Sequence, residues 1–130
     1  MKFVVAAAFA LSLSVAMAQS SSSYEPVEAA GKFHQVIFEN DRVRVLSVNI
    51  APGETVPFHQ HTMESIFVTL QPSALVFKDL QGNVVKEVRE DEYASLPFAE
   101  YRQAAPAPRS VTNVGGETMK AMRIELKDPD

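Results

Sequence analysis

The sequence predicts an all-β protein built as an antiparallel sandwich or barrel. Three observations support this class. About ten short apolar or alternating runs follow one another between residues 32 and 127, residues that favour turns separate them roughly every 6 to 10 positions, and no segment keeps the apolar period of a helix. A length of 130 residues allows one domain of ordinary size, and 46% hydrophobic residues are enough for a packed core.

The predicted strands are, in chain order, Phe33–Phe38, Val43–Ile50, Thr55–His61, Ser65–Leu70, Ala74–Asp79, Val84–Val88, Tyr93–Leu96, Glu100–Ala104, Arg109–Val114 and Lys120–Lys127. Residues that favour turns lie between many of them. Examples are Asn40-Asp41, Pro52-Gly53, Gly82-Asn83 and Gly115-Gly116. We therefore expect mostly short connections between neighbouring strands.

Two strands carry further information. Pro57 lies inside the third strand, and because proline cannot donate to a strand ladder it predicts an edge or a bulge there. The last strand alternates cleanly, which places its side chains on two distinct faces. One face carries Met122, Ile124 and Leu126, and the other carries Ala121, Arg123, Glu125 and Lys127.

The N-terminal segment has the three regions of a signal peptide. Lys2 gives a positive start, an apolar run follows, and Ala16-Met17-Ala18 supplies small residues for cleavage before Gln19. We expect residues 1–18 to be a signal peptide, 19–31 a flexible Ser-rich arm, and 32–127 the folded domain. The protein would then be periplasmic or secreted, with no membrane span in the mature chain; a short N-terminal membrane anchor is the alternative.

Composition excludes several classes of function. A net charge of −4 with only 12 Lys and Arg argues against a nucleic-acid partner, because phosphate binding needs a clustered basic face. The absence of cysteine excludes disulfides, thiolate metal ligands and a cysteine nucleophile. No Ser-His-Asp set or glycine-rich phosphate loop can be assembled from the sequence.

Three histidines remain as candidates for metal chemistry. His59 and His61 are two residues apart in a predicted strand, so their side chains would leave the same face and could share one metal ion. They could equally be hydrogen-bonded interior residues without a metal. His34 lies in the first predicted strand, and we assign it no role.

The spacing G-x5-H-x-H from Gly53 to His61 resembles the first motif of the cupin family. Segments on either side also resemble cupin strands: Asn40–Leu46, Arg109–Gly115 and Met122–Leu126. The resemblance covers roughly residues 32–127. It implies a single-domain, double-sheet jelly-roll barrel after the signal peptide, with the site inside the barrel.

The sequence departs from the cupin pattern at two of four ligand positions. Where the family has a glutamate after the second histidine, this chain has Ser65 or Ile66, and Glu64 comes one residue early. Where the second motif supplies a histidine, this chain has Arg109. The resemblance therefore implies a metal set of His59 and His61, which Glu64 would join only if a bulge turned it inward.

Three functions remain open. The first is a small-molecule binding barrel whose pocket is built around His59, His61 and Arg109, with weak or no metal; a guanidinium there suits an anion. We place its ligand-binding residues at Arg109, Ser65, Phe67 and Tyr101. The second is a metal-dependent enzyme of dioxygenase or isomerase type, with iron, manganese or zinc. The third is a structural barrel with a silent pocket. Whether the protein is an enzyme stays open.

Association is the last expectation from the sequence. Cupins commonly pair through strands near the N-terminus, and the first predicted strand is rich in apolar side chains. These are Phe33, Val36, Ile37 and Phe38. Because a free edge strand would expose them, we predict a homodimer.

Overall fold

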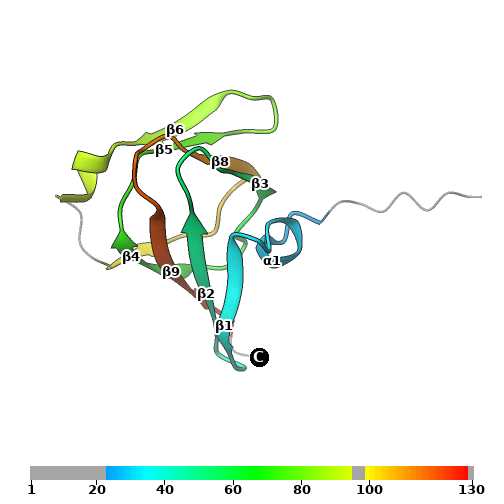
Figure 1. The fold of residues 1–130 in the computed structure, drawn as a ribbon. Coiled ribbons are helices and arrows are strands. Elements are labelled where there is room, and N and C mark those ends of the chain that lie inside the picture. The colour runs from blue at the N-terminus through cyan, green and yellow to red at the C-terminus, as the bar shows by residue number, and fades with distance from the viewer. Residues whose placement is uncertain (1–22, 95–98, 129–130) are drawn as a thin grey trace, which may run out of the picture.

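The computed structural model describes residues 23–94 and 99–128, which form two antiparallel sheets packed face to face (Figure 1). One sheet has the strand order β1-β2-β9-β4-β7 and the other β3-β8-β5-β6. The strands are β1 His34–Glu39, β2 Val43–Ile50, β3 Thr55–His59, β4 Ser65–Gln71, β5 Leu75–Lys78, β6 Val84–Val88, β7 Ala99–Arg102, β8 Arg109–Asn113 and β9 Met119–Leu126. The predicted all-β antiparallel class is confirmed.

Three predicted strands differ from the structure by two residues or more at one end. The strand predicted at Glu100–Ala104 is β7, which ends at Arg102. The segment predicted as strand Tyr93–Leu96 overlaps a 3₁₀ helix, η1, at Glu90–Ala94, and residues 95–98 lie outside the described part. The helix begins with three consecutive acidic residues, which are favourable in the first turn because they interact with the positive end of the helix dipole. The third strand ends at His59 rather than His61, because the next backbone N–H, that of Gln60, donates to the carbonyl of Tyr24 instead of a strand partner.

The irregularity expected at Pro57 is confirmed. Strand β3 is at the edge of its sheet, and its pairing with β8 shifts register between Val56 and His59, on either side of the proline. His59 itself lies opposite Arg109 in this pairing. Beyond the break in the ladder, a histidine therefore lies directly across from an arginine.

The predicted signal peptide lies outside the described residues, and so does most of the Ser-rich part of the predicted arm. Within the arm, residues 23–31 are described. Here Pro26–Ala29 forms a short helix, α1, which contacts β1 and β3 (Figure 1). The Glu25 side chain caps it by accepting from the backbone N–H groups of Val27 and Glu28. No helix in the described part of the chain is both long and apolar enough to cross a membrane.

The space between the sheets has an apolar part and a polar part. The apolar part is a cluster of buried side chains that includes Leu46, Val48, Ile50, Val56, Phe67, Leu75, Val111 and Met119. The polar part includes the charged face of β9. Arg123 and Glu125 are both buried, whereas Met122, Ile124 and Leu126 are only half-buried on the opposite face of the strand. The last strand therefore brings charge into the barrel, although its other face is the more apolar one.

Candidate metal centre

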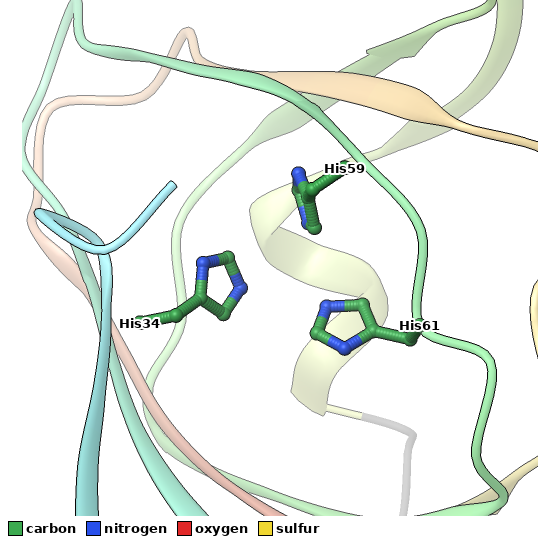
Figure 2. Close-up of side chains that lie close together, drawn as sticks. All are labelled: His34, His59 and His61. Atoms are coloured by element: carbon green, nitrogen blue, oxygen red, sulfur yellow. The ribbon is translucent and has the colours of Figure 1, made fainter. Parts of the chain in front are cut away.

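Three histidines from two distant segments meet inside the barrel. His34 is the first residue of β1, His59 the last of β3, and His61 follows two positions later. The ring centroids are separated by 4.6 Å (His34–His59), 5.1 Å (His34–His61) and 5.0 Å (His59–His61). All three side chains are buried, and one ligand nitrogen from each lies within 4.8 Å of the others (Figure 2). Three imidazoles at this spacing could hold a metal ion.

Each of the three rings has an acceptor at Nδ1. His34 Nδ1 is 3.3 Å from the carbonyl oxygen of Ala30, and His59 Nδ1 is 2.8 Å from that of Pro57. His61 Nδ1 is 3.4 Å from a carboxylate oxygen of Glu125, a long contact. A carbonyl or carboxylate oxygen can only accept, so these contacts favour the tautomer that carries the hydrogen on Nδ1. In that tautomer each Nε2 has a lone pair.

Burial keeps the three rings neutral. It is the main cause that lowers the pKa of His34 to about 3, and the nearby His59 adds to it. Burial also lowers the pKa of His59 and, further, that of His61. Arg123 contributes to the lowered pKa of all three because it is a neighbouring cation. Neutral imidazole is the form that binds a metal ion.

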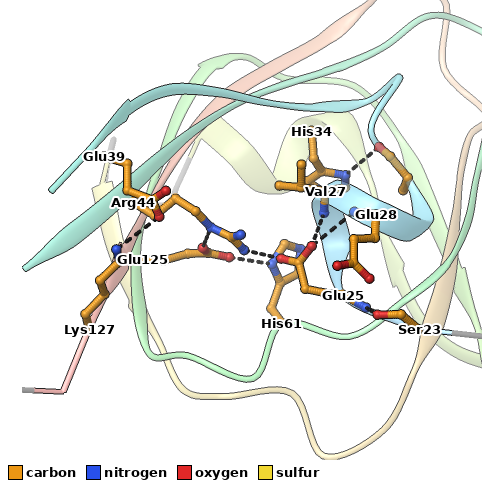
Figure 3. Close-up of polar contacts among 11 residues, drawn as sticks. Ser23, Glu25, Val27, Glu28, His34, Glu39, Arg44, His61, Glu125 and Lys127 are labelled. Atoms are coloured by element: carbon orange, nitrogen blue, oxygen red, sulfur yellow. Dashed lines mark hydrogen bonds and ion pairs between the residues drawn. The ribbon is translucent and has the colours of Figure 1, made fainter. Parts of the chain in front are cut away.

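A chain of charged groups connects His61 to the N-terminal segment (Figure 3). Glu125, whose side chain is 1% exposed, accepts from Arg44 Nε at 2.5 Å while its other oxygen faces His61. Arg44 also pairs with Glu25, the residue that caps α1. Burial disfavours the Arg44 cation, but its two carboxylate partners outweigh that effect and raise its pKa. The carboxylate behind His61 is therefore itself held in place.

A cavity of about 440 Å³ opens beside the histidines. Part of its wall is apolar and includes Phe67, Phe77 and Val56. The rest carries charge, and the cations come from four strands. They are Lys86 of β6, Arg102 of β7, Arg109 of β8 and Arg123 of β9; the carboxylates on the same wall are Glu92 and Glu100. The Arg102 guanidinium lies 3.7 Å from the centroid of the Phe67 ring and donates to Glu100 at 2.6 Å.

The residues predicted to bind a ligand fall into three positions. Arg109 and Phe67 line the cavity. Ser65 is fully buried and accepts a hydrogen bond from Arg123 at 2.9 Å, so it lies behind the arginine rather than on the cavity wall. Tyr101 is 53% exposed and lies outside the cavity, where a hydrogen bond with Glu64 raises the pKa of its hydroxyl.

Glu64 does not join the histidines. It is exposed, next to β4, on the outer side of the barrel, because Ser65 after it takes the inward position. The structure therefore has no bulge that turns Glu64 inward, as the expected metal set of His59, His61 and Glu64 required. The third member of the cluster is instead His34, which we had expected to have no role.

Sequence reasoning missed three residues of this site: His34, Arg123 and Glu125. His34 is separated by 25 positions from His59, and no local spacing connects them. The alternation of the last strand did place Arg123 and Glu125 on one face. The alternation did not indicate which of the two faces points into the barrel. The available signal was the presence of two ionisable residues, Arg123 and Glu125, on one face of a single strand.

Comparison with known proteins is informative about the fold. No protein-family model matches the sequence, and no curated protein matches it. A cupin domain from Bordetella pertussis is similar in structure, with 22% identity and a TM-score of 0.57 over 73% of this chain and 92% of that one. An RmlC-like cupin with a double-stranded β-helix fold from Methanocaldococcus jannaschii has 8% identity and a TM-score of 0.51, over 72% and 78%.

A third structure is an uncharacterised conserved protein with a double-stranded β-helix domain from Klebsiella pneumoniae. It has 13% identity and a TM-score of 0.51, over 72% of this chain and 74% of that one. Identities this low carry information about the fold alone. The family resemblance drawn from Gly53 to His61 is confirmed at that level: the chain has the double-stranded β-helix fold of the cupin superfamily.

Proposed function

We propose that this protein binds a divalent transition-metal ion through Nε2 of His34, His59 and His61, and a small molecule in the cavity beside it. The observation that carries the proposal is the set of three acceptors at Nδ1. They favour the tautomer of each ring that leaves three lone pairs for one ion.

The alternative is that the three histidines are hydrogen-bonded interior residues without a metal. This alternative does not account for the three Nε2 lone pairs. Three Nε2 lone pairs cannot bond to one another, because none carries a hydrogen. One water molecule between them would donate two hydrogens to three acceptors. A metal ion would accept all three lone pairs, and catalytic sites with three protein ligands keep a further position for water or substrate.

The set of ligand atoms also narrows the choice of metal ion. Imidazole suits zinc and iron, whereas manganese favours carboxylate, carbonyl and water oxygens. With Glu64 outside the cluster, the set holds nitrogen only among the described residues. We therefore rank zinc and iron above manganese.

The roles of the surrounding residues follow from their contacts. A bound ion would supply a Lewis acid or, with iron, a redox centre, as dioxygenase- or isomerase-type chemistry requires. Glu125 orients His61, and the Ala30 carbonyl orients His34. Phe67 and its apolar neighbours limit water in the cavity, and Arg109 offers a guanidinium to an anionic group.

A second candidate function is binding of a small anion without metal. The arginines on the cavity wall favour it, because they repel a dication as well as attract an anion. Metal content separates the two candidates. Stoichiometric zinc or iron in protein purified without chelator and then dialysed supports the metal centre. Metal-free protein that also fails to take up zinc contradicts it.

His34 provides the sharper test. We expect His34→Ala to lower zinc affinity by at least about 100-fold, since it removes one of three ligands. Affinity is measured by competition with a chromophoric chelator. The control is Gln35→Ala, at an exposed position of the same strand. Equal zinc affinity in the parent and His34→Ala would remove His34 from the centre.

A further inference from the structure

The cavity wall beside the three histidines carries more positive than negative charge. Lys86, Arg102, Arg109 and Arg123 lie on it, against Glu92 and Glu100. One of these carboxylates, Glu100, is already bound by Arg102. The histidines are neutral and add no compensating charge. A negative group from outside the chain would balance this wall.

Arg123 is the cation most deeply placed. Its side chain is buried, its Nη1 donates to Ser65 Oγ at 2.9 Å, and its Nε is buried without a hydrogen-bond partner among the described residues. A buried N–H without a partner is costly. Burial, followed by the nearby Arg102, lowers the pKa of Arg123 to about 9, so the group remains a cation at neutral pH. It therefore keeps one unpartnered donor, and Glu125 and Glu100 are the carboxylates that act on its charge.

Arg123 also shares the cavity wall with the three histidines. Its guanidinium repels any dication held between their rings. Metal binding and the Arg123 cation therefore oppose each other, and an anion between the metal ion and the guanidinium would relieve that repulsion.

We propose that a small organic carboxylate completes this site by binding the metal ion and Arg123 at the same time. The inference rests on the proposed metal centre and names the class of its ligand. A carboxylate has two oxygens, so one can bind the metal while the other accepts from the guanidinium. Phe67 lies beside both Arg102 and Arg123, with centroid distances of 3.7 Å and 5.0 Å, and the apolar wall suits the carbon body of such an acid.

The two ligands bind cooperatively in this arrangement. The carboxylate raises metal affinity because it neutralises the repulsion from Arg123, and by linkage the metal raises carboxylate affinity by the same factor. A neutral molecule of the same shape has no such effect. Cooperativity between zinc and a carboxylate is therefore the property to measure.

The first experiment uses the unmodified protein after removal of metal. Zinc affinity is measured by chelator competition in acetate, butyrate or benzoate, and in the matched neutral compounds acetamide, butyramide and benzamide. Ionic strength is held constant with sodium chloride, and the chelator alone corrects for zinc–carboxylate complexes in solution. We expect at least one carboxylate to raise zinc affinity about tenfold or more, and no amide to change it.

The outcomes separate this inference from the proposal beneath it. Absence of zinc binding under all conditions overturns the metal centre itself. Zinc binding of equal affinity with carboxylates, amides and chloride overturns the carboxylate alone. Inorganic phosphate is measured in the same way. An increase in zinc affinity with phosphate but with none of the carboxylates also overturns the inference, because the ligand class would then be wrong.

A variant tests the role of Arg123. In Arg123→Gln we expect zinc alone to bind more tightly than in the parent, because the neighbouring cation is gone, and the increase due to carboxylate to fall below about threefold. The matched control is Arg42→Gln, at an exposed position, which should keep the parental increase. An undiminished increase in Arg123→Gln would assign the carboxylate to another group. If Arg123→Gln does not fold, Arg123→Lys takes its place, because it keeps the charge and loses the Nε–H donor. The carboxylate series measured on the unmodified protein still decides whether the inference stands.

Discussion

Glu125 is a buried carboxylate whose two oxygens serve different partners. One faces His61 Nδ1, and the other accepts from Arg44. Carboxylate–histidine pairs of this kind orient a metal-binding ring and increase its basicity. Burial of this charge is tolerated because Arg44 balances it. Glu125 is thus a positioning residue for the third ring of the cluster.

We expect Glu125→Gln to lower zinc affinity by about 10- to 100-fold, because the amide loses the charge that orients His61 and balances Arg44. Zinc competition measures the affinity, and the visible spectrum of the cobalt-substituted protein reports the geometry. Glu87→Gln, at an exposed position, is the control. Partial recovery in Glu125→Asp is expected. A folded Glu125→Gln protein with parental affinity and cobalt spectrum would exclude a positioning role.

His34 illustrates how much of the site the sequence could predict at the level of single residues. The H-x-H spacing identified His59 and His61, because two residues apart in a strand is a local relation. His34 joins them through the tertiary structure, in which α1 contacts both β1 and β3. Ser65, predicted to bind the ligand, is buried, whereas Tyr101, predicted to bind it as well, is 53% exposed because its strand turns that side chain outward.

At the level of elements, α1 and the residues beside it support both segments that carry the three histidines. The Tyr24 carbonyl accepts from Gln60 N–H at 2.7 Å, between His59 and His61. The Ala30 carbonyl accepts from the His34 backbone at 3.0 Å and also lies near its ring. Glu25 reaches His61 through Arg44 and Glu125. The segment that the sequence indicated as part of a loose arm is thus part of the frame of the site.

We expect Glu25→Gln to lower zinc affinity several-fold, because it weakens both the cap of α1 and the support of Arg44. The matched control is Glu28→Gln, in the same helix at an exposed position. Zinc competition and thermal unfolding of the metal-free proteins are measured together. Loss of thermal stability with unchanged zinc affinity would limit Glu25 to a structural role.

At the level of the whole molecule, an apolar row crosses the outer face of the five-stranded sheet. The pairing of neighbouring strands brings Phe38, Val45, Ile124, Ile66 and Tyr101 into one line. Phe38 and Tyr101 at its ends are each more than half exposed. Strand β1 is at the sheet edge and exposes Val36 and Ile37 as expected, whereas Phe33 is buried. Such a row is a candidate interface between two copies.

We predict a homodimer that uses this row. Light scattering at micromolar concentration should give twice the mass of one chain. The double substitution Phe38→Ser and Tyr101→Ser should shift the protein to monomer without unfolding it, because both side chains are largely exposed. The substitution Val84→Ser, at an exposed apolar position of β6 in the other sheet, is the control. A parental protein of single-chain mass would contradict the prediction.

Export is a second prediction for the whole molecule. Lys2, the apolar run and Ala16-Met17-Ala18 predict cleavage before Gln19 and a periplasmic or secreted protein. Intact-mass analysis of protein from the extracytoplasmic fraction should give a chain that begins at Gln19. Recovery from that fraction with Met1 retained would contradict the cleavage site, and recovery only from the cytoplasm would contradict export.

The sequence by itself determined the all-β class, most strand positions, the irregularity at Pro57 and the pairing of His59 with His61. These features depend on contacts between residues close in the chain, where strand alternation and turn chemistry act. The tertiary structure decided that His34 completes the cluster, that Arg123 and Glu125 point inward, and that Glu64 points outward. Alternation separates the two faces of a strand but does not say which one the fold encloses. That choice depends on partners far away in sequence, such as Arg44 for Glu125 and Ser65 for Arg123.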